Sequence, residues 1–229
     1  MDNTELMTQG LSKTPHSLLE QKRRAYIVLG PEISGTKLLA EILLKCCGLK
    51  GQVTDGSLPE EGEDLIMMRW SLPSGLFDLA SPQWATHNDR MVDIPSIIET
   101  LEKRNYLPVF LGITRSWIAV TKSRIKQYKQ HGDSRFGPPD SLDTHLHMVK
   151  RGISYFYENV PQTGYPWYMF SYEEITTDPD LFVPQLSKFL NLEFNGLDKL
   201  DWPIKGQNSK WFKEDENAEG DPFKFDTWG

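Results

Sequence analysis

Two stretches of the sequence carry polar side chains at a spacing suited to holding phosphate groups. The first, GPEISGTK at residues 30–37, lies between an apolar run and a segment with helical periodicity. Its two glycines have the spacing of a nucleotide-triphosphate loop, but Thr36 and Lys37 stand in reverse order, so no hydroxyl follows the lysine to bind magnesium. Backbone N–H groups and a helix N-terminus still predict an anion site, to which Ser34 and Thr36 add hydroxyl donors. The alternative is an ordinary strand-to-helix turn, which every α/β protein contains.

The second stretch, ITRSWIAVTKS, places Arg115 directly after an apolar run and Ser123 eight residues later. Eight residues are about two helical turns, so both side chains project toward one side of the following helix. A guanidinium matches the geometry of a phosphate, and a serine adds a hydroxyl donor. The spacing predicts a second phosphate site at the end of a second strand. The alternative pairs Arg115 with a carboxylate and leaves Ser123 facing solvent.

Apolar runs alternate with helical patterns along most of the chain. The runs that predict strands are residues 25–29, 65–70, 107–114 and 165–172. The patterns that predict helices cover residues 36–47, 94–104, 116–130, 142–160 and 178–190. This alternation predicts an α/β, three-layer P-loop-like fold with a mostly parallel central sheet flanked by helices. Ligands of such sheets bind at the carboxyl ends of the strands, where both polar stretches lie.

Length and composition limit the possible partners and compartment. The 229 residues predict a polar tail at 1–22 and a single α/β domain at 23–229. A net charge of −7 argues against a nucleic-acid partner. The two cysteines, Cys46 and Cys47, are expected to be buried apolar residues in a reducing compartment. No stretch of about 20 apolar residues occurs, so we expect a cytoplasmic protein without a membrane partner.

Taken together, the segments resemble the sulfotransferases that use 3′-phosphoadenosine 5′-phosphosulfate (PAPS). GPEISGTKLL is similar to the family loop that grips the 5′-phosphosulfate, and Arg115 with Ser123 resembles the pair that grips the 3′-phosphate. FSYEEITTDPDLFVPQLSKFLNL is similar to a family segment whose tyrosine, here Tyr172, lies near the adenine. RWSLPSG resembles the family's KTHLP, and NSKWF resembles an NxKY segment near the C-terminus. The resemblance spans residues 25–212.

The resemblance implies transfer of a sulfuryl group from PAPS to a hydroxyl or amine of a small-molecule or glycan acceptor. The product nucleotide is 3′,5′-adenosine bisphosphate, and no metal is required. The acceptor's identity and the oligomeric state are not implied. The residues that the resemblance assigns to the nucleotide are Ser34, Gly35, Thr36, Lys37, Arg115, Ser123 and Tyr172.

Two departures from the family concern the catalytic residues. Ile33 stands where the family has the lysine that bridges the leaving phosphate and the sulfuryl group, and Ser71 stands in place of the catalytic histidine. Lys37 and Arg69 are the candidate replacement cations. His87 is the candidate general base that accepts the acceptor's proton. The other candidates for this role are Asp89, His145, His147 and Glu63.

Two alternatives stay open at the level of sequence. The isoleucine and serine substitutions allow a degenerate protein that binds PAPS or another nucleotide without turnover. An ATP-dependent kinase could use GPEISGTK as a degenerate nucleotide-triphosphate loop, but no hydroxyl follows Lys37 and no second acidic magnesium site follows a strand.

Overall fold

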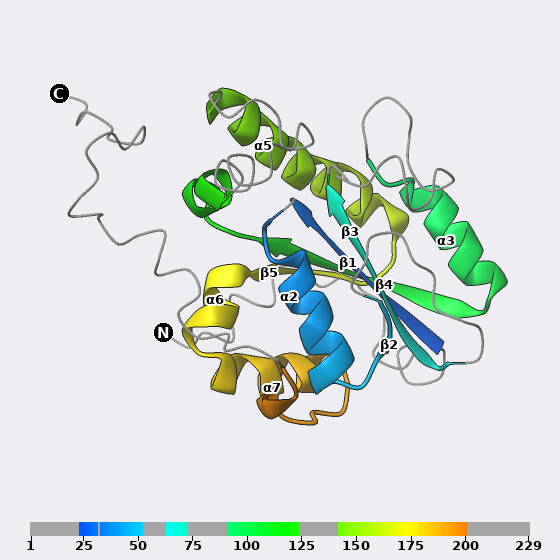
Figure 1. Cartoon of the computed structure of the whole chain (residues 1–229). Coiled ribbons are helices and arrows are strands. Elements are labelled where there is room, and N and C mark those ends of the chain that lie inside the picture. The colour runs from blue at the N-terminus through cyan, green and yellow to red at the C-terminus, as the bar shows by residue number, and fades with distance from the viewer. Residues whose placement is uncertain (1–22, 32, 53–62, 73–90, 124–141, 201–229) are drawn as a thin grey trace, which may run out of the picture.

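The central sheet consists of five parallel strands in the order β2-β3-β1-β4-β5 (Figure 1). This computed structural model describes residues 23–31, 33–52, 63–72, 91–123 and 142–200, without the side chains of 142–145 and 148. The strands are β1 (Arg23–Pro31), β2 (Lys50–Gly51), β3 (Leu65–Leu72), β4 (Tyr106–Thr114) and β5 (Trp167–Ser171). The predicted α/β class with a parallel sheet flanked by helices is confirmed.

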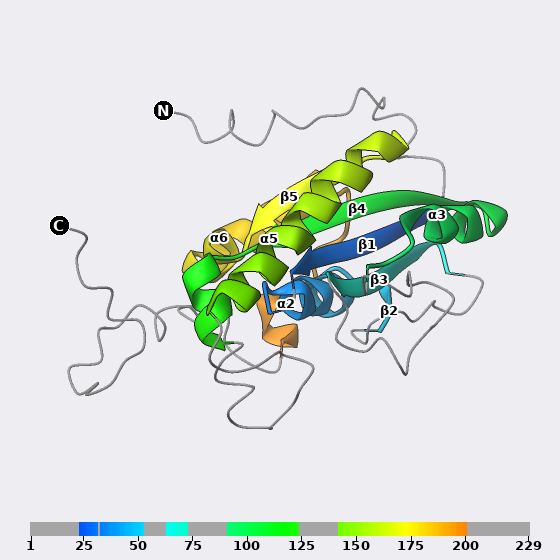
Figure 2. The same cartoon turned by 90° about the horizontal axis from the view of Figure 1, so that it is seen from above.

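β1 is buried on both of its faces because helices cover both sides of the sheet. Tyr26 and Val28 point into one hydrophobic cluster, whereas Ala25, Ile27 and Leu29 point into the other. This alternation explains why the strand is a continuous apolar run rather than an alternating one. Helices on both faces of the sheet form the two layers (Figures 1 and 2).

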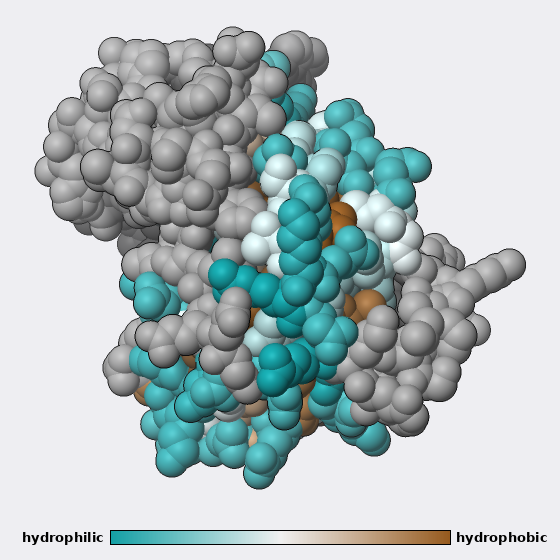
Figure 3. All heavy atoms as spheres, turned by 90° about the vertical axis from the view of Figure 1, so that its right-hand side faces the viewer, coloured by the Kyte–Doolittle hydropathy of each residue, from teal (hydrophilic) through white to brown (hydrophobic). Residues whose placement is uncertain are grey.

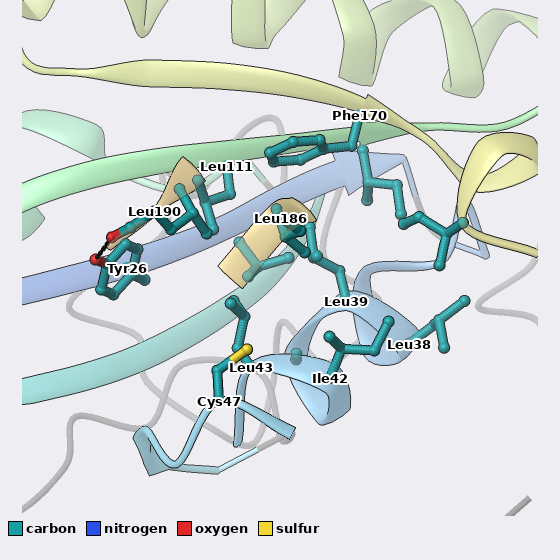
Figure 4. Close-up of a cluster of buried hydrophobic side chains, with 14 of the residues drawn as sticks. Tyr26, Leu38, Leu39, Ile42, Leu43, Cys47, Leu111, Phe170, Leu186 and Leu190 are labelled. Carbon is teal, nitrogen blue, oxygen red and sulfur yellow. Dashed lines mark hydrogen bonds between the residues drawn. The ribbon is translucent and has the colours of Figure 1, made fainter. Parts of the chain in front are cut away.

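The layer against Tyr26 and Val28 contains α2 (Thr36–Glu41), the π-helical η2 (Ile42–Cys46), α6 (Tyr172–Thr177) and α7 (Pro179–Phe189). The opposite layer contains α3 (Ile94–Lys103) and α5 (Leu142–Asn159). Short 3-10 turns, η5 (Pro161–Thr163) and η6 (Leu197–Lys199), follow α5 and α7. Figure 4 shows leucines of α2 and α7 packed against β1 and β4.

Local sequence signals explain where two of these helices begin. The carboxylate of Asp93 accepts a hydrogen bond from the backbone N–H of Ser96 (3.1 Å), and proline occupies the first turn of α3. Asp178 accepts from the backbone N–H of Leu181 (3.3 Å), again with a proline in the first turn of α7. Both patterns satisfy N–H groups that the helix itself leaves unpaired.

Three element predictions differ from the structure in detail. The expected helix at 36–47 changes from α to π after Glu41, although Cys46 and Cys47 are buried as predicted. The expected strand at 165–172 ends at Ser171, because Tyr172 begins α6. The expected helix at 116–130 begins at residue 117, and its residues 124–130 lie outside the described residues, as does the predicted tail at 1–22.

The amino end of β1 is fixed to the end of α7. Arg24 donates from Nη1 to the carbonyl of Leu190 (2.9 Å) and from Nη2 to that of Asn191 (3.2 Å). The Tyr26 hydroxyl donates to the same Leu190 carbonyl (3.0 Å), as Figure 4 shows. These bonds satisfy carbonyl groups that lie beyond the last turn of α7.

The surface on the side of α3 is mostly hydrophilic where the residues are described, with small hydrophobic spots between polar side chains (Figure 3). None of the helices in the described ranges is long and apolar enough to cross a membrane.

Candidate phosphate-binding site

The carboxyl ends of β1, β3, β4 and β5 lie at one edge of the sheet, because these strands are parallel and in register. Gly30 of β1 pairs with Ser71 of β3, and Thr114 of β4 pairs with Ser171 of β5. The loop that leaves β1 therefore lies near the side chains at the ends of the neighbouring strands. Contacts with the loop involve Arg69, Arg115 and Tyr172, which were all predicted from the sequence.

The loop has an unusual backbone at two successive positions. Ile33 has φ 67° and Gly35 has φ 108°, with Ser34 between them donating its N–H to the carbonyl of Pro31 (2.9 Å). Positive φ is unfavourable for a β-branched residue, so Ile33 is held in place by its surroundings. Gly35 is required for a second reason, since a Cβ atom there would overlap Cδ2 of Tyr172.

The Ser34 side chain points into the turn itself. It is fully buried, and its Oγ has no hydrogen-bond partner within the described part of the chain. A Cβ atom on Gly30 would lie only 2.8 Å from this oxygen, so Gly30 leaves the space that the hydroxyl occupies. A buried hydroxyl without a partner is costly, and a ligand group with a hydrogen-bond acceptor would remove that cost after a change of rotamer.

The two candidate cations for the reacting group differ in where they point. Nη1 of Arg69, on β3, donates to Oγ1 of Thr36 (3.0 Å), the buried first residue of α2. The ammonium of Lys37 lies 3.7 Å from Oε1 of Glu41, one turn along the helix, and 68% of its side chain is exposed. Arg69 therefore contacts the loop, whereas Lys37 lies along the exposed side of α2.

Arg115 links the loop to the start of α6. Its Nη1 donates to the carbonyl of Ile33 (3.2 Å), and its guanidinium carbon lies 4.2 Å from the centre of the Tyr172 ring. Tyr172 is buried, with its ring against both Gly35 and Arg115. Burial raises the pKa of Tyr172, and Arg115 opposes that increase. Burial also lowers the pKa of Arg115, but an arginine remains cationic at neutral pH.

The carboxylate of Glu173 joins the ends of β4 and β5, and sequence reasoning missed it. Oε1 accepts from the backbone N–H of Ser116 (2.9 Å), and Oε2 accepts from Oγ of Ser171 (3.1 Å). The only signal in the sequence was its place beside Tyr172, within the segment already singled out.

For two further residues named from the sequence, Ser123 and Ser71, the structure shows burial. Ser123 lies in the helical residues 117–123 and is 9% exposed, so the alternative in which it faces solvent is wrong. Ser71 is buried beside Gly30. Trp70, next to Arg69 on β3, is packed in the core.

The general base is not located by the described residues. His87 and Asp89 lie outside them, as does the side chain of His145. His147 is exposed on α5, and Glu63 precedes β3 at the opposite end of the sheet from the loop. His87 therefore stays a prediction of the sequence.

Comparison with known proteins finds sulfotransferases among the similar solved structures. No family model matches the chain, and a search of the curated proteins found no match. Among solved structures, mouse sulfotransferase SULT7A1 in complex with PAP has a TM-score of 0.44 and 10% identity, over 85% of this chain and 68% of the mouse chain. The sulfotransferase domain of the Synechococcus PCC 7002 olefin synthase has a TM-score of 0.44 and 17% identity, over 87% of this chain and 91% of that domain. Both are sulfotransferases, but likenesses at this level assign no role to any residue of this chain.

Proposed function

We propose that the protein transfers a sulfuryl group from PAPS to a hydroxyl or amine acceptor. The observation that carries this proposal is the contact of two arginines, from the ends of two different strands, with one main-chain loop. Arg69 reaches the loop at Thr36 and Arg115 reaches it at Ile33. Two cationic groups around a loop with successive N–H groups suit a ligand with two anionic groups, which PAPS has.

The residues of the site fit such a nucleotide. The loop N–H groups and Thr36 are proposed to hold the 5′-phosphosulfate. The buried Ser34 hydroxyl, which has no partner among the described residues, is proposed as a further donor. Arg115 and Ser123 are proposed to hold the 3′-phosphate, and Tyr172 the adenine side. The strained backbone at Ile33 supports this assignment, because strain in a loop of this kind is typical of a ligand-binding position.

The proposed chemistry requires charge stabilisation and positioning. The acceptor oxygen or nitrogen attacks sulfur in line with the bridging oxygen, and the S–O bond to the phosphate breaks as the new bond forms. Negative charge then develops on the leaving phosphate. Of the two candidate replacement cations, Arg69 rather than Lys37 contacts the loop, and we assign Arg69 the role of stabilising this charge. The acceptor's proton passes to a general base, for which His87 remains the candidate.

Isothermal titration calorimetry tests the nucleotide assignment. We expect tight binding of 3′,5′-adenosine bisphosphate without added metal, and weak binding of ATP with or without Mg²⁺. The opposite preference would contradict the proposal and favour a kinase.

Turnover separates the enzyme from a binding protein that keeps the same fold. Radiolabelled PAPS is incubated with a panel of phenols, amines and glycans, and the label in each acceptor is counted. Arg69→Met should reduce turnover by more than about tenfold, since stabilisation of developing charge is typically worth this much or more. Lys37→Met should have a smaller effect, and Lys188→Met, on the exposed side of α7, provides the control.

The second candidate is a PAPS-binding protein without turnover. Ile33 in place of a lysine and the buried Ser71 in place of a histidine favour it. It predicts bisphosphate binding with no labelled product from any acceptor. Under this alternative, Ile33→Lys would be the first step toward activity, because it restores a cation beside the loop. The cytoplasmic location remains a prediction of the sequence.

A further inference from the structure

Glu173 lies where three parts of the proposed site meet. Its carboxylate accepts one hydrogen bond from the backbone N–H that follows Arg115 and another from the hydroxyl of Ser171, the last residue of β5. Its neighbour Tyr172 packs against Gly35 of the loop. The Glu173 side chain therefore connects Ser116, the residue after Arg115, to the start of α6, where the Tyr172 ring packs against the Arg115 guanidinium.

These bonds add to the pairing of β4 with β5. The strands pair as far as Thr114 and Ser171, and Oγ1 of Thr114 donates to the carbonyl of Phe170 (3.4 Å). Beyond that point the two segments separate, since Tyr172 begins α6 and Arg115 lies after the end of β4. The Glu173 carboxylate extends the connection to Ser116, two residues beyond the last paired residue of β4. It thereby fixes the backbone from which the Arg115 side chain projects.

The position of the Arg115 guanidinium depends on this connection. It lies 4.2 Å above the Tyr172 ring and bonds to the Ile33 carbonyl, 82 residues away in the sequence. A long side chain holds one such geometry only when its backbone and its packing surface are both fixed. Glu173 fixes both, because it bonds to the residue after Arg115 and is adjacent to Tyr172.

The negative charge of Glu173 needs an explanation, because Glu173 lies beside a proposed anion site. A carboxylate beside an anion site repels the anion, although this one also attracts the Arg115 guanidinium and favours its charged form. The two hydrogen bonds that it accepts at 2.9 and 3.1 Å explain why a carboxylate is present despite that repulsion.

We propose that Glu173 is a positioning residue for the second phosphate site: it holds Arg115 in place for the 3′-phosphate and so determines the preference for nucleotides that carry one. This inference rests on the proposed function, in which Arg115 binds that phosphate.

The experiment compares two ligands in matched variants. Calorimetry measures the affinities of 3′,5′-adenosine bisphosphate and of 5′-AMP, which lacks the 3′-phosphate, for the wild type, Glu173→Gln and Glu174→Gln. Glu174 is the adjacent, exposed carboxylate of the same helix turn, so its variant makes the same change in net charge. We expect Glu173→Gln to weaken bisphosphate binding by about tenfold, as for other coupled contacts, and to leave 5′-AMP binding within about twofold. Glu174→Gln should weaken neither.

The sign of the effect distinguishes positioning from simple electrostatics. Loss of a nearby negative charge should strengthen anion binding, so unchanged or tighter bisphosphate binding by Glu173→Gln would overturn the inference. Equal losses for both ligands would also overturn it, because they would show a general structural defect. In a double-mutant cycle, Glu173→Gln and Arg115→Lys should be non-additive for the bisphosphate, and additivity would contradict the coupling.

A variant that fails to fold and a wild type without a ligand preference would each have a distinct meaning. Should Glu173→Gln fail to fold, Ser171→Ala removes one of the two hydrogen bonds and should weaken the bisphosphate alone by a smaller factor. A wild-type protein that binds the bisphosphate no better than 5′-AMP would contradict the proposed function itself. A wild type that prefers the bisphosphate, together with a Glu173→Gln variant that keeps this preference, would contradict only the role of Glu173.

Discussion

Two arginines, Arg24 and Arg115, are each packed against a tyrosine ring and bonded to a main-chain carbonyl, at opposite edges of the sheet. Arg24 lies at the amino end of β1, 5.7 Å from the centre of the Tyr26 ring, and bonds to two carbonyls after α7. Arg115 lies beyond the carboxyl end of β4, 4.2 Å from the centre of the Tyr172 ring, and bonds to the Ile33 carbonyl. The same contacts thus occur twice.

The difference lies in what each arginine holds. Arg24 binds carbonyls at the C-terminal end of a regular helix, where a cation is favourable and the backbone is unstrained except for the αL residue Asn191. Arg115 holds a loop in which Ile33 has positive φ and Ser34 has a buried hydroxyl with no partner among the described residues. Contacts of one kind therefore stabilise the fold at one edge and hold a strained loop, the proposed binding site, at the other.

The largest effect is expected on the free energy of unfolding when Arg24, which stabilises the fold, is replaced. Arg24→Met should lower the free energy of unfolding by about 3 kcal/mol, because one buried and one partly buried hydrogen bond from a charged donor are lost. Urea unfolding followed by circular dichroism measures this change. Arg23→Met, at the neighbouring exposed ion pair with Asp64, should cost less than about 1 kcal/mol. The folded Arg24→Met protein should bind 3′,5′-adenosine bisphosphate normally, and a loss of affinity would remove the distinction between the two edges.

Arg115→Met should show the reverse pattern. We expect bisphosphate affinity to fall by about 10- to 100-fold, the equivalent of one charge-assisted interaction, and stability to fall by less than in Arg24→Met. Calorimetry and urea unfolding on the same samples give both values. A variant that is strongly destabilised yet keeps its affinity would make Arg115 a second structural arginine.

Strain at Ile33 is tested by replacing this residue with glycine, which adopts a positive φ without strain. Ile33→Gly should leave the free energy of unfolding within about 0.5 kcal/mol of the wild type, because relief of the positive φ offsets the lost burial. Ile98→Gly, at a half-buried isoleucine on α3, should lower it by about 2 kcal/mol, from the lost burial and the cost of glycine in a helix. Equal losses in the two variants would show that Ile33 is unstrained.

The last prediction concerns pH and the two buried thiols in the hydrophobic cluster that contains Tyr26. Burial raises the pKa of the Cys46 thiol to about 11 and that of Cys47 to about 12. The unfolded chain therefore loses these protons first, so the free energy of unfolding should fall as pH rises above about 8.5, by roughly 1 kcal/mol for each thiol at about pH 9.5. Urea unfolding in reducing buffer measures this slope, and Cys47→Ala should flatten it. Bisphosphate affinity should stay constant over the same range, because Arg115 remains charged.

The sequence predicted the sheet well because each strand is a local apolar run and each helix has a local periodicity. It also predicted that the loop, Arg69, Arg115 and Tyr172 lie at one edge, since parallel strands place their carboxyl ends together. It did not predict the π-helical turn after Glu41 or the start of α6 at Tyr172. Both depend on packing against other elements, for which a single sequence contains no direct signal.

The sequence by itself determined the fold class and which residues lie at the edge of the sheet where a ligand would bind. Only the tertiary structure decided that Arg69 rather than Lys37 contacts the loop, that Arg115 holds Ile33, and that Glu173 connects β4 with β5. The physical reason is that periodicity is a property of neighbouring residues. These contacts instead join residues 33, 82 and 57 positions apart, and their geometry is set by strand register and side-chain packing.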